Sequence, residues 1–125
     1  MKYYKEYQEI VKILEEIKSY VNDETDTTWA GFKDANDFLI ELSKDIELLK
    51  LCDYETLEKV NIEFLATSTY QELSLSDGWS DEYLILAYKF DDLYLKISKN
   101  NFFNYLIYYV KFFLKNYKIL LKIRK

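Results

Sequence analysis

The stretch KYYKEYQEIVKILEEIKSYV, residues 2–21, decides the fold class because its apolar side chains recur every three or four residues. This spacing places them on one face of an α-helix, with most of the charged side chains opposite. The apolar stripe consists of Tyr3, Tyr7, Ile10, Leu14, Ile17 and Val21. We therefore predict a helix from Lys2 to about Val21.

Two more segments repeat the helical spacing. We expect one helix from about Asp34 to Leu51 and another from about Tyr54 to Leu65, with Asp53 as the N-cap of the second. Their apolar stripes are Phe38, Leu39, Leu42, Ile46 and Leu49 in the first, and Leu57, Val60 and Phe64, flanked by Ile62 and Leu65, in the second. The polar stretch NDETDTT, residues 22–28, predicts a connector.

The next stretch, ATSTYQELSLSDG at residues 66–78, shows two-residue alternation and predicts an irregular segment with a very short strand near 70–76. Asp77 and Gly78 form a turn signal. We expect Ser80 to cap a fourth helix that continues to Ile97, because acidic residues follow where the helix dipole favours negative charge. The predicted inner face of this helix is Tyr83, Leu84, Ala87 and Phe90.

The C-terminal region predicts a fifth helix. We expect Asn100 and Asn101 to cap a helix from about Phe102 to Ile123, within a basic aromatic C-terminal segment, 100–124. The chain has 125 residues, no proline and two glycines, which leaves few breakers for a turn-rich β fold. The predicted fold is all-α, a single domain over residues 1–125 built as a bundle of about five helices.

Charge is distributed unevenly along the chain. Residues 1–92 hold 9 lysines and 22 acids, a net charge of −13, whereas residues 93–125 hold 8 basic residues and no acid, a net of +8. We call residues 1–92 the acidic body. The apolar run in the tail, FFNYLIYYVKFFL, is too short to span a bilayer. Three alternatives stay open for the tail: packing against other helices, lying on an anionic membrane surface, and a contact between copies of the chain.

Several kinds of catalysis lack the residues they need. The chain has no histidine and one cysteine, which excludes Ser-His-Asp and Cys-His catalysis and a structural zinc site. It has no glycine-rich phosphate loop or dinucleotide fingerprint. The acids in NDETD lack EF-hand spacing, and adjacent acids such as Asp81 and Glu82 diverge around a helix. We predict a protein that is not an enzyme and uses no metal or cofactor.

Single residues add expectations about environment. Cys52 follows an apolar stripe and predicts a buried, inert thiol, and one cysteine suits a reducing cytoplasm. The charged N-terminus does not read as a secretory signal, so we expect a cytoplasmic protein without stable membrane insertion. Trp29 is expected in the core, where it would anchor its loop to the following helix.

The remaining function class is binding. A net of −13 over the acidic body repels nucleic acid and attracts basic proteins. Lysine outnumbers arginine 16 to 1, which is atypical of a surface that reads phosphates. The alternative is a structural or regulatory helical module that forms a homo-oligomer through its aromatic last helix.

A pattern between Trp29 and Asp91 resembles small bacterial immunity proteins of polymorphic-toxin and contact-dependent inhibition systems. The residues that carry it are Trp29, Gly31-Phe32, Leu39, Leu42, Thr69, Gln71-Glu72, Gly78-Trp79, Glu82-Tyr83-Leu84, Leu86-Ala87 and Phe90-Asp91. The resemblance covers about half of the chain. It implies a cytoplasmic protein that binds one cognate toxin domain and blocks its active site, often that of a nuclease with a basic groove.

The stretch QELSLSDGWSDE, residues 71–82, has two interpretations. In the first it is a helix entry, where Gly78 permits a positive φ and Trp79 packs onto Tyr83. In the second it faces the partner. The candidate partner-binding residues are Glu72, Asp77, Trp79, Asp81 and Glu82.

Overall fold

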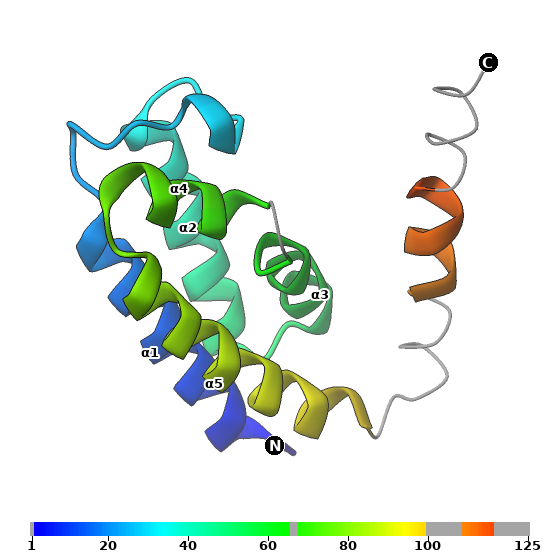
Figure 1. Ribbon diagram of the computed structural model, residues 1–125. Helices are drawn as coiled ribbons and strands as arrows, with labels where there is room; N and C mark the ends of the chain where they lie inside the picture. Colours follow the sequence, from blue (N-terminus) through cyan, green and yellow to red (C-terminus); the bar gives the residue numbers. More distant parts are fainter. Residues whose placement is uncertain (1, 66–67, 100–108, 117–125) are drawn as a thin grey trace. The chain divides into compact units, whose positions relative to one another are not determined.

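The computed structural model describes residues 2–65, 68–99 and 109–116, and every regular element among them is a helix. The elements are α1 (Tyr4–Tyr20), the short 3₁₀ helix η1 (Thr28–Ala30), α2 (Ala35–Lys50), α3 (Tyr54–Glu63), α4 (Thr69–Asp77) and α5 (Ser80–Ser98) (Figure 1). Residues 109–116 are also helical. The prediction of an all-α fold is confirmed.

The chain forms two compact units, Met1–Tyr94 and Leu95–Lys125. The first contains α1 to α4 and most of α5. In the second, the structure describes the end of α5 and the helical segment 109–116. The rest of the predicted fifth helix, over 102–108 and 117–123, lies outside the described residues. No helix within the described ranges is both long enough and apolar enough to cross a membrane.

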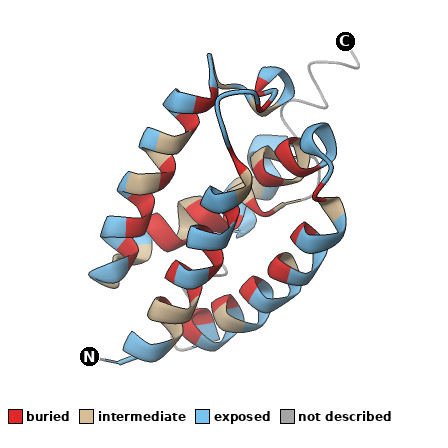
Figure 2. Ribbon diagram, turned by 90° about the vertical axis from the view of Figure 1, so that its left-hand side faces the viewer, coloured by how far each residue is buried: buried red, intermediate tan, exposed pale blue. Residues whose placement is uncertain are grey.

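Helices α1 and α2 pack side by side and run in opposite directions (Figure 1). Gln8, near the start of α1, donates from Nε2 to the carbonyl of Lys50 at the end of α2, at 3.3 Å. The facing stripes are buried, as the sequence predicts, except that Tyr3 and Leu39 are half-buried (Figure 2). Leu14 and Leu49 are fully buried, and replacing either with alanine would cost about 2–5 kcal/mol.

An aromatic cluster joins α3, α4 and α5. The Phe64 ring stacks on Phe90 with centroids 4.2 Å apart and meets Tyr70 edge-on at 4.8 Å. Tyr83 donates its hydroxyl hydrogen to the Phe64 carbonyl at 3.0 Å. These contacts use the predicted Phe64 and Phe90 stripes, together with Tyr70, which was predicted in a strand.

The predicted strand near 70–76 is wrong, because Thr69–Asp77 forms α4. Tyr70, Leu73 and Ser74 are all buried, and their three- and four-residue spacing is helical rather than alternating. Gly78 ends the helix in the left-handed region at φ 82°, and its N–H donates to the Ser74 carbonyl at 3.0 Å. The turn predicted at Asp77-Gly78 is therefore the C-cap of a helix.

Helix α5 begins at Ser80, with Asp81 and Glu82 in its first turn, and ends one residue beyond the predicted Ile97. Ser80 is inside the helix rather than its cap, because the Tyr83 N–H donates to the Trp79 carbonyl at 2.9 Å. The predicted inner face is partly wrong. Leu84 is exposed and Ala87 half-buried, while Leu86 and Tyr94 join Tyr83 and Phe90 in the core.

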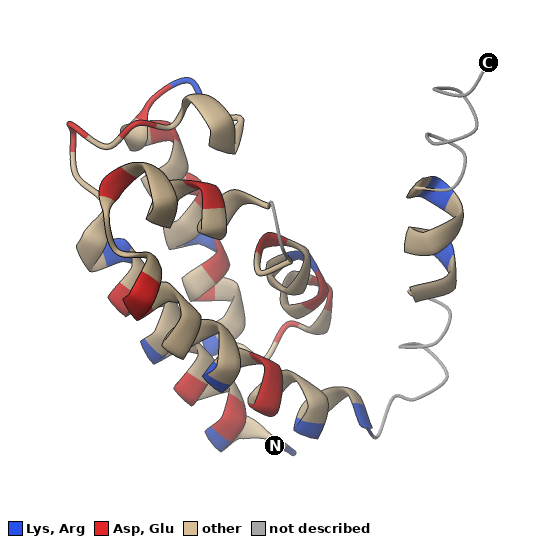
Figure 3. Cartoon of the chain, in the orientation of Figure 1, with Lys and Arg blue, Asp and Glu red and all other residues tan. Residues whose placement is uncertain are grey.

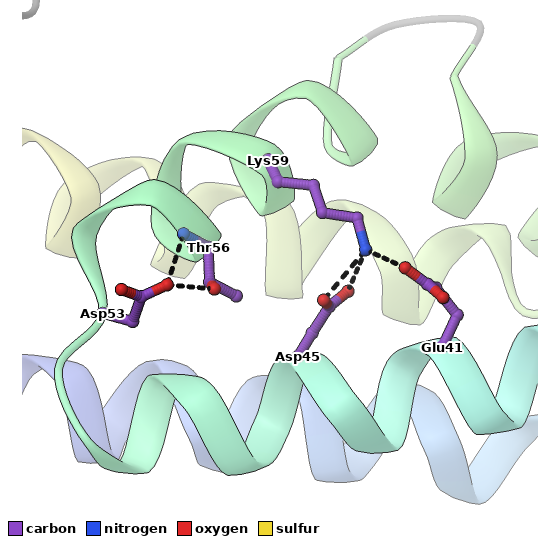
Figure 4. Close-up of polar contacts among 5 residues, drawn as sticks. All are labelled: Glu41, Asp45, Asp53, Thr56 and Lys59. Atoms are coloured by element: carbon purple, nitrogen blue, oxygen red, sulfur yellow. Dashed lines mark hydrogen bonds and ion pairs between the residues drawn. The ribbon is translucent and has the colours of Figure 1, made fainter.

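The link between α2 and α3 shows one prediction confirmed and one corrected. Asp53 is the N-cap of α3, and its Oδ2 accepts from the Thr56 N–H at 3.1 Å (Figure 4). Cys52 is half-buried rather than buried, at a left-handed φ of 59° in the tight turn after α2. Partial burial raises the pKa of its thiol.

Candidate functional site: the acidic end

Four segments converge at the end of the first unit where α1 finishes and α2 begins. Thr25 Oγ1, in the loop after α1, donates to Asp77 Oδ2 at the end of α4, at 3.0 Å. Helix η1 packs against α4. Tyr20 at the end of α1 stacks on Trp79 before α5, with ring centroids 4.9 Å apart. We call the surface formed by residues 22–30, Asp77 and the first turn of α5 the acidic end (Figure 3).

The loop of the acidic end is held by its own polar groups. Asn22 Oδ1 accepts from the Glu24 N–H at 2.8 Å, and the Asn22 N–H donates to Thr25 Oγ1 at 3.0 Å. Asp26 Oδ1 accepts from the Thr28 N–H at 3.0 Å, and hydrogen bonds from Thr28 lower the pKa of Asp26. The loop is thus an ordered surface in which hydrogen bonds favour the ionised form of Asp26.

The solvent exposure of the two tryptophans is the reverse of what the core and partner-binding predictions imply. Trp29, predicted in the core, is 76% exposed on η1, whereas Trp79, a candidate partner-binding residue, is 4% exposed. Trp79 also meets Tyr83 edge-on at 6.3 Å, as the helix-entry interpretation predicts. Its indole nitrogen is buried without a hydrogen-bond partner. The exposed aromatic side chain of the acidic end is therefore Trp29.

Of the other candidate partner-binding residues, three lie in the acidic end and Glu72 lies outside it. Asp77, Asp81 and Glu82 are exposed, and Glu72 is half-buried on the first turn of α4. Sequence reasoning missed Trp29 and the loop acids of this surface: Asp23, Glu24 and Asp26. The signal that finds these acids is a lack of lysine and arginine, which occur in neither 19–32 nor 60–88.

Within the acidic end, residues 22–30, Asp77 and the first turn of α5, every charged side chain is an acid, and Lys18 and Lys33 lie outside it along the chain. The two lysine-free segments contribute Asp23, Glu24 and Asp26 from one and Asp77, Asp81 and Glu82 from the other. Loss of solvation and the neighbouring Glu16 raise the pKa of Tyr20, and Glu82 adds to the effect. A surface of this kind attracts cations and basic protein groups over several ångströms.

Carboxylates between α2 and α3 are arranged differently. Lys59 Nζ contacts Asp45 Oδ1 and Oδ2 at 2.9 and 3.2 Å and also pairs with Glu41 (Figure 4). Asp45 is 5% exposed, and burial raises its pKa against the opposing effect of Lys59. The hydrogen bond from Lys59 lowers the pKa of Glu41. Here one lysine pairs with two acids, and the cluster joins α2 to α3.

A second group of perturbed side chains lies next to α4. Burial raises the pKa of Glu63, whose Oε2 atom is buried without a hydrogen-bond partner, and a hydrogen bond with Thr69 partly offsets the shift. Burial also raises the pKa of Tyr70 well above its usual range. Tyr70 is fully buried in the core, so this group is placed to hold α3 and α4 together rather than to meet a solute.

Two hollows lie outside the acidic end. One, of about 350 Å³, lies between α1 and α5 and is lined by charges of both signs, including Lys12, Lys89 and Glu16. The other, of about 670 Å³, follows the exposed apolar side of α2 at Ile40 and Leu48. Neither combines one sign of charge with an exposed aromatic ring.

Comparison with protein-family models, curated proteins and solved structures found no match for this chain. Within the part of the chain that the structure describes, no group of three or more His, Cys, Asp or Glu residues could hold a metal ion. The fold and the site define an all-α protein whose most distinctive surface is acidic and carries an exposed tryptophan. The absence of enzymatic activity stays a prediction.

Proposed function

We propose that the protein binds a basic partner protein through the acidic end and neutralises it by occupying its surface. The observation that supports this most is that acids from two lysine-free segments lie at one end of the first unit, which also carries the exposed Trp29. Acidic groups raise the association rate with a basic partner and exclude acidic competitors. The buried side of the same region, with Tyr20 stacked on Trp79, gives these groups a fixed support.

Trp29 provides the apolar part of the proposed interface. Tryptophan is enriched among residues that dominate binding energy, and its ring also attracts arginine and lysine side chains. Trp29 follows Asp26 by three residues, and η1, which carries Trp29, packs against α4. An arginine that stacks on the indole would therefore remain within reach of carboxylates.

Within this class, we propose an immunity protein for a cognate toxin domain. Support comes from the resemblance of the segment from Trp29 to Asp91 to small bacterial immunity proteins. Three residues that carry this resemblance, Trp29, Gly78 and Glu82, lie at or next to the acidic end. A nuclease groove is basic because it binds phosphates, so an acidic surface can cover it without any chemistry of its own. The partner would be the product of the gene immediately upstream.

Co-expression with that product tests the proposal. Wild-type protein should protect the cells and co-purify with the toxin. Trp29→Ala should lose protection, whereas Leu51→Ala should keep it. Leu51 is a matched control because it is 73% exposed and follows the far end of α2. Growth arrest with the wild type, or equal protection by both variants, would count against the acidic end as the binding surface.

A second pair of variants tests the charge. Asp81→Asn with Glu82→Gln removes two acids from the first turn of α5, and Glu6→Gln with Glu55→Gln removes first-turn acids from α1 and α3. Each pair loses a similar helix-dipole stabilisation, about 0.3–1 kcal/mol per charge. Only the first pair should weaken co-purification, and raised salt should weaken binding of the wild type.

A further inference from the structure

The outer face of α5 carries an exposed apolar stripe within the first unit. Leu84, Ile85 and Tyr88 are 51%, 58% and 77% exposed. Tyr88 follows the other two by four and three residues, so the three side chains share one face, opposite Tyr83 and Phe90 in the core. Contiguous apolar side chains gain free energy when a partner covers them, and they are typical of interaction surfaces.

Acids border this stripe at both ends. Asp81 precedes Leu84 by three residues, and Asp91 follows Tyr88 by three. Both acids are exposed, and ten residues of helix place them about 15 Å apart along the axis. Figure 3 shows acidic residues at the start of α5 and again farther along it. Asp81 belongs to the first turn of α5, so the stripe begins directly after the acidic end.

Charge separates the possible occupants of the stripe. Residues 81–92 carry four acids and one lysine, a net charge of −3, and all five are exposed. In an antiparallel pair of α5 helices centred between Leu84 and Tyr88, Asp81 of one copy would lie level with Asp91 of the other. In a parallel pair, each acid would lie level with itself. Because like charges across an interface are costly, a basic partner fits this face better than a second copy does.

We propose that the stripe on α5 binds an amphipathic helix that carries lysine or arginine at both ends of its apolar face. Aliphatic side chains of that helix pack between Leu84, Ile85 and Tyr88, as ridges and grooves do in helix pairs. Its basic residues, about ten positions apart, reach Asp81 and Asp91. The identity of the protein that carries this helix rests on the proposed function, whereas the pairing of the two helices can be measured by itself.

A synthetic peptide is the probe for this pairing. It is a helical peptide of about 15 residues with leucines on one face and lysines ten positions apart at its ends, and its counterpart has glutamates in place of the lysines. Fluorescence anisotropy of the labelled peptides with the full chain should show saturable, salt-sensitive binding of the lysine peptide alone. Equal binding of both peptides, or no binding of the lysine peptide at low salt, would overturn the proposal.

A matched pair of variants locates the apolar contact. Leu84→Ser with Ile85→Ser should lower the affinity for the lysine peptide about tenfold or more, because each serine removes an apolar contact. Leu48→Ser with Ile40→Ser replaces the same two residue types on α2, where they are 42% and 54% exposed. This control should bind the peptide as the wild type does, and equal losses in the two variants would contradict a site on α5.

A second pair of variants tests the charge at the far end of the stripe. Asp91→Asn should lower the affinity about two- to fivefold. Glu15→Gln removes an exposed acid from α1 and changes the net charge of the protein by the same amount. It should leave the affinity unchanged. Equal effects of the two substitutions would mean that only the overall charge attracts the peptide.

Trp29→Ala separates this proposal from the acidic end. It should bind the lysine peptide as the wild type does. A loss with Trp29→Ala but not with Leu84→Ser and Ile85→Ser would place the peptide at the acidic end and overturn the site on α5, while the proposed function would stand. A peptide held by α5, in a protein that does not bind the product of the upstream gene, would contradict the proposed function alone.

The remaining occupants of the stripe have their own signatures. Circular dichroism and urea midpoints show whether the serine variants fold, and Asp91→Asn keeps a readout if they do not. A much lower midpoint for Leu84→Ser with Ile85→Ser than for the α2 control would mean that the stripe is already covered within the chain. A dimer in light scattering that this variant dissociates would mean that a second copy covers it. Either result would overturn the proposal.

Discussion

Trp29 and Trp79 have similar neighbours in the sequence, but one is exposed to solvent and the other is buried. Each lies within two residues of a glycine in the left-handed region, Gly31 at φ 84° and Gly78 at φ 82°, and each lies in a segment without lysine or arginine. Yet Trp79 is stacked on Tyr20 in the core, and Trp29 faces solvent on η1.

The difference comes from what each tryptophan can reach. Trp79 comes directly before a long amphipathic helix, so Tyr83 meets its ring four residues later while α1 provides Tyr20 on another side. Trp29 belongs to a helix of three residues that has no repeating apolar face. Trp79 is buried because the helix that follows it presents an apolar face to the core, and Trp29 has no such helix after it. The similar residues around the two tryptophans do not determine which of them is buried.

The largest expected effect separates these two residues by stability. Trp79→Ala should lower the free energy of unfolding by about 3–5 kcal/mol, because it leaves a cavity between Tyr20 and Tyr83. Trp29→Ala should change it by less than about 0.5 kcal/mol. Urea denaturation followed by circular dichroism measures both. Equal losses in the two variants would mean that Trp29 is also packed in solution.

The next effect compares the loss of a lysine partner at a buried carboxylate with the same loss at an exposed one. Lys59→Met should cost about 2 kcal/mol, because Asp45 is left buried without its partner while Lys59 itself is partly exposed. The control, Lys50→Met, removes a lysine whose partner Glu47 is mostly exposed, and it should cost less than about 0.5 kcal/mol. Similar urea midpoints for the two variants would show that Asp45 needs no counter-charge.

A smaller effect tests the link between the acidic loop and α4. Thr25→Val removes the hydrogen bond to Asp77 and also the one that Thr25 Oγ1 accepts from the Asn22 N–H, and it should cost about 1.5 kcal/mol while loosening the loop that carries Trp29. Ser76→Ala, at an exposed position of the same helix, should be close to neutral. Quenching of Trp29 fluorescence in a Trp79→Phe background would report the loop. An unchanged urea midpoint and quenching profile would contradict the role of Thr25.

The smallest effect depends on pH and has opposite signs at two acids. Folded protein holds the Glu63 proton more tightly than the unfolded chain, because burial raises its pKa. Stability from this group is therefore present at low pH and falls as pH rises from about the ordinary value of 4.5 through the higher folded pKa. For Glu41, whose pKa is lowered, stability is present above 4.5 and falls as pH drops.

Urea midpoints of Glu63→Gln and Glu41→Gln between about pH 3 and pH 8 measure these signs against the wild type. As the pH falls, the stability of the wild type relative to Glu63→Gln should rise. Over the same range, the stability of the wild type relative to Glu41→Gln should fall. Parallel curves for all three proteins would contradict both shifts.

The sequence predicts the first three helices well because each shows an uninterrupted apolar stripe. The predicted ends of α1 to α3 differ from the observed ones by at most two residues, and Asp53 caps α3 as expected. Helix α4 was missed because its nine residues also show polar and apolar alternation, and only the burial of Tyr70 with Leu73 distinguishes the two periods.

The candidate site was predicted in part. Acids at Asp77, Asp81 and Glu82 were identified from local helix-entry chemistry, which sequence shows directly. The loop acids and Trp29 could not be joined to them, since the contact between Thr25 and Asp77 spans 52 residues and accompanies the packing of η1 against α4. Long-range placement of this kind has no local signal.

The most direct test of the acidic end as a binding surface is titration calorimetry with the purified product of the upstream gene. Wild type should bind it, with an affinity that falls as salt is raised. Trp29→Ala should weaken the affinity about thirtyfold or more, and Leu51→Ala should leave it unchanged. Equal affinity of the wild type and Trp29→Ala, with no dependence on salt, would contradict a partner held by the acidic end.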